Sequence, residues 1–184
     1  MKKAGENKKI LYIFFRYIFL ILIALPNLFL FYFIFTPLTI YPVNFFLSLI
    51  YTSYIQGNSL TVNNIQIILV DACIAGSAYY LLILLNFSLS MPCLKRIKTT
   101  LFSLLIFLGI NIIRIFIFTI LFIQNFKYFD LTHKLFWYLV SGIIVFFVWL
   151  LTIKTYHVKN IPFYTDLKFL YGLTKRKPRS KKSK

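Results

Sequence analysis

The sequence predicts an all-α integral membrane protein: a four-span helical bundle with an interfacial helix and a short extended segment on its outer side. Of its 184 residues 60% are apolar, and the mean hydropathy is +0.80, whereas soluble domains average about 45–50% apolar residues. Four apolar stretches are long enough to cross a bilayer, which takes about 20 residues. These features argue against a soluble enzyme, a disordered tail and a secreted disulfide scaffold.

The predicted spans have in common a long run of apolar residues, and they lie at about residues 10–35, 72–89, 101–124 and 135–155. A basic segment before the first run is also typical of a signal peptide. This run is too long for one and no small-residue cleavage site follows it, so we expect a retained helix with a kink at Pro26. Residues 1–155 then form the membrane domain. Residues 156–184 form a basic cytoplasmic tail, disordered from about Tyr171.

The connection between the first two spans contains the extra elements. Two prolines and several polar residues interrupt its apolar character, so we expect Tyr41–Ile55 to be a helix that lies in the outer interface. Gln56–Ser59 is a turn signal. The segment 59–70 has an extended pattern, with a possible hairpin turn at Asn63–Asn64.

Basic residues set the expected orientation. Four lysines precede Ile10, three basic residues lie in the 91–99 loop, and ten lie from Lys154 to Lys184. The positive-inside rule places these three segments, and hence both termini, in the cytoplasm of a multi-pass cell-membrane protein. The connections 36–71 and 125–134 then face outward. In this context the net charge of +17 indicates contact with anionic membrane lipid and not with nucleic acid.

Arg114 is an ionisable residue in the middle of the third span. Placing it there costs several kcal/mol, which makes a functional role the default hypothesis. Asn111 lies three residues earlier, so both side chains share one helix face that must point into the bundle. The alternative is a structural arginine that satisfies backbone carbonyls.

Cys73 begins the second span among small residues. Helical spacing puts Cys73, Gly76, Ser77 and Tyr80 on one face. A lone cysteine in an apolar stretch usually only packs. Asp71, two residues before it, sits at the outer rim, where it could orient a catalytic side chain.

His133 strengthens the case for Cys73 because it precedes the fourth span and so lies on the same outer side. The long side chain of Arg114 can rise toward that side. Thiol, imidazole and guanidinium can therefore meet below the outer surface. A neighbouring cation or imidazole favours the thiolate, which is the nucleophile.

Other chemistries are not indicated. Cys93 lies in the cytoplasmic loop, about one bilayer from Cys73, so the two cannot form a disulfide. His157 is also cytoplasmic and cannot share a metal with His133. Zinc, phosphate-loop and serine-hydrolase motifs do not occur, and we expect neither a metal nor a cofactor.

These residues together resemble the exosortase/archaeosortase family of membrane transpeptidases. The family pattern is Ala-Cys-Ser-Gly after an extended outer segment, then Asn-x-x-Arg in a later span, then His before the last span. Here Ala72-Cys73, Asn111-Ile-Ile-Arg114 and His133 occur in that order.

The resemblance covers about residues 56–150. Cys73 is followed by Ile-Ala-Gly, so the serine of the family is missing and the glycine comes one place later, at Gly76. This form looks like the pacearchaeosortase branch, in a short version of the fold.

The resemblance implies a sortase-like cysteine peptidase and transpeptidase. Its substrates would be secreted proteins that end in a recognition motif, a transmembrane helix and a basic cluster. Cys73 would form a thioester with the substrate, His133 would act as general base and acid, and Arg114 would stabilise the oxyanion or the thiolate. Asn111 and Tyr80 would support them. The released protein would pass to a lipid or other cell-surface acceptor.

Two other functions stay open at the level of sequence. One is a non-enzymatic four-span scaffold, in which Cys73 would be inert. The other is a small transporter in which Arg114 binds an anion and Cys73 has no role.

Overall fold

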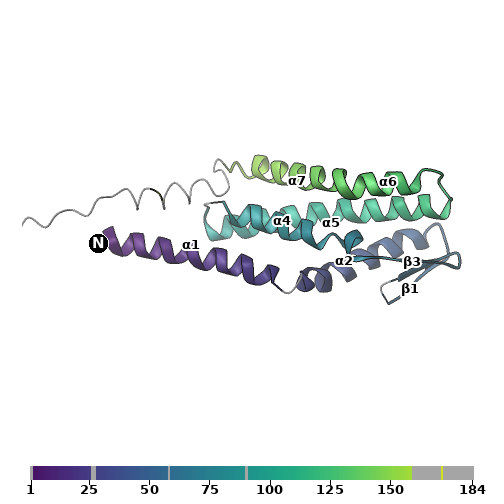
Figure 1. Ribbon diagram of the computed structural model, residues 1–184, viewed down its shortest axis with the longest axis horizontal. Helices are drawn as coiled ribbons and strands as arrows, with labels where there is room; N and C mark the ends of the chain where they lie inside the picture. Colours follow the sequence, from purple (N-terminus) through teal and green to yellow (C-terminus); the bar gives the residue numbers. More distant parts are fainter. Residues whose placement is uncertain (1, 26–27, 58, 90, 159–170, 172–184) are drawn as a thin grey trace, which may run out of the picture.

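Helices that run along one long axis, with a small sheet at one end, make up the fold (Figure 1). The computed structural model describes residues 2–25, 28–57, 59–89, 91–158 and 171. The helices are α1 (Lys2–Ala24), α2 (Phe29–Ser48), α3 (Asp71–Ile74), α4 (Gly76–Phe87), α5 (Cys93–Ile123), α6 (Phe129–Leu135) and α7 (Ser141–Thr155). A π-helical turn, η1 (Phe136–Val140), joins α6 to α7. The strands are β1 (Ser53–Gln56), β2 (Ser59–Val62) and β3 (Ile65–Ile68).

The chain passes along the long axis in alternating directions. Helices α1 and α2 lead toward the sheet, α4 returns, α5 leads out again, and α6, η1 and α7 return (Figure 1). Near one end Arg96 donates a hydrogen bond to the Tyr12 hydroxyl, and the rings of Phe102 and Tyr156 meet edge-on at 5.5 Å. The start of the chain, the loop before α5 and the end of α7 therefore lie at the same end of the molecule.

Three of the described helical segments are long and apolar enough to cross a membrane. They are Phe29–Ser48, Cys93–Ile123 and the continuous run Phe129–Thr155. Their outer faces keep large apolar side chains exposed, including Leu105 and Phe147 at 58% and 63%. Such a surface suits lipid and not water, so the protein is embedded in a membrane. The predicted third and fourth spans lie within these helices.

The first half of the chain differs from the expectation. The predicted single helix at 10–35 is two helices, because α1 ends at Ala24 and α2 begins after Leu28, whose φ of 60° is left-handed. Helix α2 then continues through both prolines to Ser48. The predicted interfacial helix Tyr41–Ile55 is therefore wrong: its first part belongs to α2 and its last part to β1. The expected kink at Pro26 lies outside the described residues.

Packing explains why α2 tolerates two prolines. Each proline removes a backbone hydrogen bond, but Phe35, Val43 and Leu47 on the same helix are buried. In a membrane-spanning helix, packing against neighbouring helices and local adjustments of the backbone satisfy the groups that a proline frees. Tertiary packing has outweighed the local preference.

The predicted second span is also interrupted. Ala75, with φ 61°, ends α3 and begins α4. The 12 residues of α4 are too few to cross a bilayer. The break also turns Cys73 away from the face that carries Tyr80, so the common face predicted for Cys73, Gly76, Ser77 and Tyr80 is wrong.

The extended segment is confirmed and forms an antiparallel sheet in the order β1-β2-β3. Asn63 and Asn64, with φ of 48° and 68°, make the turn between β2 and β3, as a two-residue hairpin requires. The register pairs Val62 with Ile65 and Ser59 with Ile68. The sheet thereby ends close to Asp71, the first residue of α3.

Tyr79 fixes α4 between its neighbours. It is fully buried, its ring stacks on Phe35 of α2 at 3.6 Å, and it meets Phe107 of α5 edge-on at 4.9 Å. Aromatic pairs of this kind add about 0.5–1.5 kcal/mol beyond the buried area. This packing holds the start of α4, and with it the short helix α3, against α5.

Candidate active site

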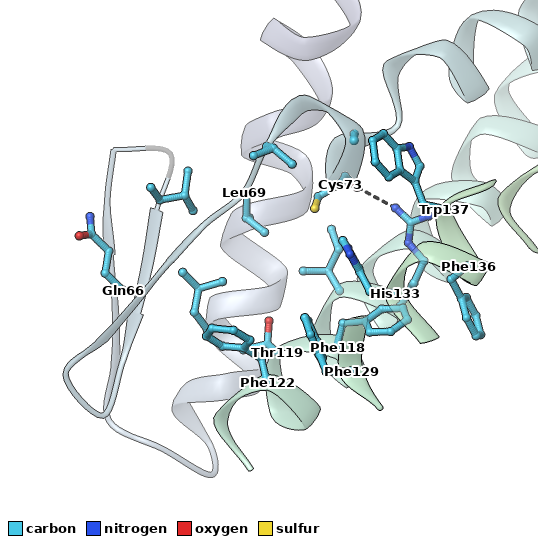
Figure 2. Close-up of a pocket in the computed structure, with 16 residues that line it drawn as sticks. Gln66, Leu69, Cys73, Phe118, Thr119, Phe122, Phe129, His133, Phe136 and Trp137 are labelled. Atoms are coloured by element: carbon cyan, nitrogen blue, oxygen red, sulfur yellow. Dashed lines mark hydrogen bonds between the residues drawn. The ribbon is translucent and has the colours of Figure 1, made fainter. Parts of the chain in front are cut away.

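A cavity of about 400 Å³ lies between the β3–α3 segment on one side and α5, α6 and η1 on the other (Figure 2). Its wall is mostly apolar and includes Leu69, Phe118, Phe122 and Phe129. The size is within the range of small-ligand and peptide pockets, about 300–1,000 Å³. Arg114 is the one Lys, Arg, Asp or Glu side chain among the described residues that line it.

Cys73 lies on α3 at the wall of this cavity. Its backbone N–H donates to the carbonyl of Val70 at 2.8 Å, which forms the first turn after the sheet. The side chain is half-buried, and Figure 2 shows the sulfur turned toward the cavity. The thiol is therefore accessible from the cavity while its backbone is fixed.

Arg114 and Asn111 hold the backbone of α3. Arg114 Nη2 donates to the Cys73 carbonyl at 3.0 Å, and Asn111 Nδ2 donates to the carbonyls of Cys73 and Ile74 at 3.2 and 3.3 Å. The break at Ala75 leaves these carbonyls without helical partners, because the last carbonyls of a helix have none within it. Arg114 thus does satisfy a backbone carbonyl, and in doing so it lies next to the cysteine.

Ser141 is a partner that the sequence did not reveal. Arg114 Nη1 donates to its Oγ at 2.7 Å, and that Oγ donates to the carbonyl of Phe136 at 2.7 Å. The second bond spans the π-helical turn η1. The extra residue of this turn rotates Ser141 so that its side chain faces α5. The sequence offers little signal for it, since a serine in an apolar span commonly bonds to its own helix.

His133 approaches the cavity from α6. Its ring stacks on Phe129 at 5.5 Å and meets Phe118 edge-on at 5.4 Å. The side chain is half-buried and lines the same cavity as Cys73 and Arg114. Figure 2 shows the imidazole and the sulfur facing the same space.

Two other predicted site residues lie elsewhere. The Tyr80 hydroxyl donates to the carbonyl of Leu20 in α1 at 3.3 Å, and its ring packs edge-on against Phe31. Asp71 is exposed and lines a separate depression with Tyr32. The structure therefore brings together Cys73, Arg114, His133 and Asn111 but leaves out Tyr80 and Asp71.

Cys93 lies far from the cavity. It is exposed at the start of α5, 21 residues before Arg114, which corresponds to about 31 Å along a helix. Among the described residues, no group of three or more His, Cys, Asp or Glu side chains could hold a metal ion.

No family model matches the chain, and neither a curated protein nor a solved structure matches it.

Proposed function

We propose that the protein is a sortase-like cysteine transpeptidase, with Cys73 as nucleophile, His133 as general base and acid, and Arg114 as the cation beside them. The observation that carries the proposal is the single cavity to which all three side chains contribute. They come from three separate parts of the chain, α3, α5 and α6. The resemblance to the exosortase/archaeosortase family supports the same assignment.

The proposed reaction has two steps. The Cys73 thiolate attacks the carbonyl carbon of a peptide bond, and its electrons form an oxyanion that Arg114 stabilises. The C–N bond breaks, the leaving amine takes a proton from the imidazolium of His133, and a thioester remains. A nucleophile of the acceptor then gives its proton to His133, attacks the thioester and releases the Cys73 thiolate. Atoms and charges balance without a cofactor.

Arg114 suits a role in this reaction better than a role as a free anion site. Its bonds to Cys73 and Ser141 use two of its five N–H groups. Each terminal nitrogen donates one N–H to a protein oxygen and keeps a second. The bond to the Cys73 carbonyl favours a guanidinium that positions the nucleophile, and the three remaining N–H groups can donate to an oxyanion formed beside Cys73.

The substrate we propose is a secreted protein with a C-terminal recognition motif, a transmembrane helix and a basic cluster. The cavity wall is mostly apolar, and Arg114 is the one Lys, Arg, Asp or Glu side chain among the described residues that line it, which suits a peptide segment that enters from a membrane surface. The end of the bundle with the start of α1, the loop before α5 and the end of α7 would face the cytoplasm, and the cavity would open toward the outer surface.

Removal of the thiol tests the proposal. Cys73→Ala should abolish processing of a co-expressed secreted protein that carries the tripartite tail, measured as its size shift. Cys73→Ser should reduce processing by several orders of magnitude, because a site suited to a thiolate does not activate a hydroxyl.

The matched control is Cys93→Ala, which removes the other thiol of the chain at the far end of α5. It should process the reporter at the normal rate. Normal processing by Cys73→Ala would refute the transpeptidase assignment and favour the scaffold.

A further inference from the structure

Strand β3 has one edge without a strand partner. It is the last strand in the order β1-β2-β3 and pairs with β2 alone. Within the described part of the chain no other backbone group bonds to Ile65–Ile68. An unpaired strand edge is a template for a further strand.

The cavity that contains Cys73 borders this edge. Five consecutive residues, Gln66 to Val70, line it. Successive side chains of a strand point to opposite faces, so a cavity on one face would meet every second residue. Three of the five, Gln66, Ile67 and Ile68, are consecutive residues of β3, whereas Leu69 and Val70 follow its end. Contact with three strand residues in a row indicates that the cavity follows the edge of the strand, and β2 occupies the other edge.

The register identifies which backbone groups point into the cavity. The two-residue turn makes Val62 and Ile65 a hydrogen-bonded pair. Pairs alternate along an antiparallel ladder, so Leu60 and Ile67 also bond to each other. The N–H and C=O groups of the residues in between, Gln66 and Ile68 on β3, point away from β2.

We propose that the segment of the substrate next to its scissile bond binds as a fourth strand on the free edge of β3. This inference rests on the proposed function. Backbone hydrogen bonds to Gln66 and Ile68 would hold the segment, and Cys73 follows five residues after Ile68 at the wall of the same cavity. Strand pairing would place a carbonyl of the substrate next to the Cys73 sulfur through backbone hydrogen bonds, which do not depend on most of the substrate's side chains.

The cavity wall opposite β3 indicates what the segment carries. Phe118 and Phe122 of α5 and Phe129 of α6 form that wall, and charged side chains are absent from this part of the described lining. A strand at the edge of β3 directs alternate side chains to opposite faces. The occupant is therefore an extended peptide with at least one apolar or aromatic side chain near the scissile bond.

The direction of the added strand follows from the membrane. The chain runs along β3 toward the bundle and enters it at α3 (Figure 1). A substrate whose transmembrane helix follows the scissile bond also runs toward the bundle. The substrate strand is thus parallel to β3.

A peptide vinyl sulfone tests the proposal on the full-length protein in detergent. The parent probe is acetyl-Val-Phe-Ala vinyl sulfone, which adds the Cys73 sulfur to its vinyl carbon and takes up one proton. Three further probes each carry one N-methylated amide. The protein is the Cys93→Ala variant, so that Cys73 is its one thiol. The rate of labelling is measured by intact-protein mass.

Strand pairing predicts a period of two in this series. Methylation of an amide that points to β3 should slow labelling about fivefold, as expected for one lost hydrogen bond. Methylation of the neighbouring amide should have little effect. Replacement of Phe by Asp in the probe should slow labelling further, because a charge would enter the aromatic wall.

Two protein variants isolate the edge of β3. Ile68→Pro removes the N–H that points into the cavity and keeps the ladder to β2. Ile68→Ala removes the exposed side chain and keeps that N–H. The peptide probe should label Cys73 about fivefold more slowly in Ile68→Pro than in Ile68→Ala. Iodoacetamide, which needs no strand pairing, should label Cys73 at the same rate in both variants, which shows that the reactivity of the thiol itself is unchanged. Thermal unfolding in the same detergent shows that both variants are folded.

The outcomes separate the two proposals. If iodoacetamide labels Cys73 but the N-methyl series lacks the period of two, the strand pairing is overturned and the nucleophile stands. If iodoacetamide does not label Cys73 in the folded protein, the proposed function fails and the strand inference with it. If Ile68→Pro converts a dimer to a monomer and leaves peptide labelling unchanged, the edge binds a second copy of the chain and the inference is wrong.

Discussion

Arg114 connects α3, the helix that contains Cys73, to α7 through two different terminal nitrogens. One nitrogen donates to the Cys73 carbonyl and the other to Ser141 Oγ. Lysine keeps the charge but has a single nitrogen on a shorter chain, so it cannot span both acceptors. The geometry of the guanidinium should therefore matter more than its charge.

Arg114→Lys and Arg114→Ala should lower the rate of processing by similar factors, about a hundredfold or more, as for the loss of an oxyanion donor. Ser141→Ala is the matched control, because it removes one acceptor and leaves the guanidinium in place; we expect a smaller loss, about tenfold. The initial rate of reporter cleavage is the measurement. Full activity in the lysine variant would reduce Arg114 to a general positive charge.

Most of the candidate site could be predicted at the level of residues. Cys73, Arg114 and His133 carry chemistry that is rare in apolar segments, and Asn111 shares a helix face with Arg114 inside the uninterrupted α5. Tyr80 was misplaced because its position depended on a helix that is broken at Ala75. Ser141 was missed because its direction depends on the π-helical turn before it.

Among the secondary-structure elements, the break between α3 and α4 at Ala75 affects the site most. It leaves the carbonyls of Cys73 and Ile74 free to accept hydrogen bonds from Arg114 and Asn111. Alanine is the best helix former, and no glycine or proline marks the position itself, so local propensity gave no signal. Pro37 and Pro42 have the opposite effect: two prolines argue against a span in this part of the sequence, but α2 continues through both. Burial of the apolar face of α2 overrides both.

Ala75→Gly discriminates between a broken and a continuous helix by the sign of its effect. At φ 61° glycine avoids the left-handed penalty of alanine, about 1–2 kcal/mol, so the variant should raise the apparent Tm. In a continuous helix the same change would cost about 1 kcal/mol and lower it. Thermal unfolding in one detergent is the measurement. Ala75→Val is the comparison, which should destabilise, because a β-branched residue fits the left-handed region poorly.

At the scale of the whole molecule, the start of α1, the loop before α5 and the end of α7 lie at one end, and the cavity lies toward the other. The rule that places positive loops in the cytoplasm predicted which segments lie together, and contacts such as Arg96 to Tyr12 agree with it. The number of complete crossings was harder to predict. Hydropathy does not report where a run of apolar residues breaks.

Thiol labelling on intact cells tests the proposed orientation. A membrane-impermeant maleimide should label Cys73, which faces the cavity, and should spare Cys93 at the other end of α5. After permeabilisation with detergent both thiols should react, which serves as the control for accessibility. Labelling of Cys93 alone in intact cells would invert the orientation and place the cavity in the cytoplasm.

Because α5 is long, the depth of the cavity in the membrane depends on the thickness of the surrounding bilayer. Its 31 residues extend about 46 Å, whereas the hydrocarbon core is about 30 Å thick. The part of the helix that is longer than the hydrocarbon core must tilt or extend beyond the core. In a thicker bilayer this part is shorter. Because Arg114 lies on this helix and bonds to the Cys73 carbonyl, we expect hydrophobic mismatch to change how much water reaches the thiol. The same chain would then work at different rates in membranes with short and with long acyl chains.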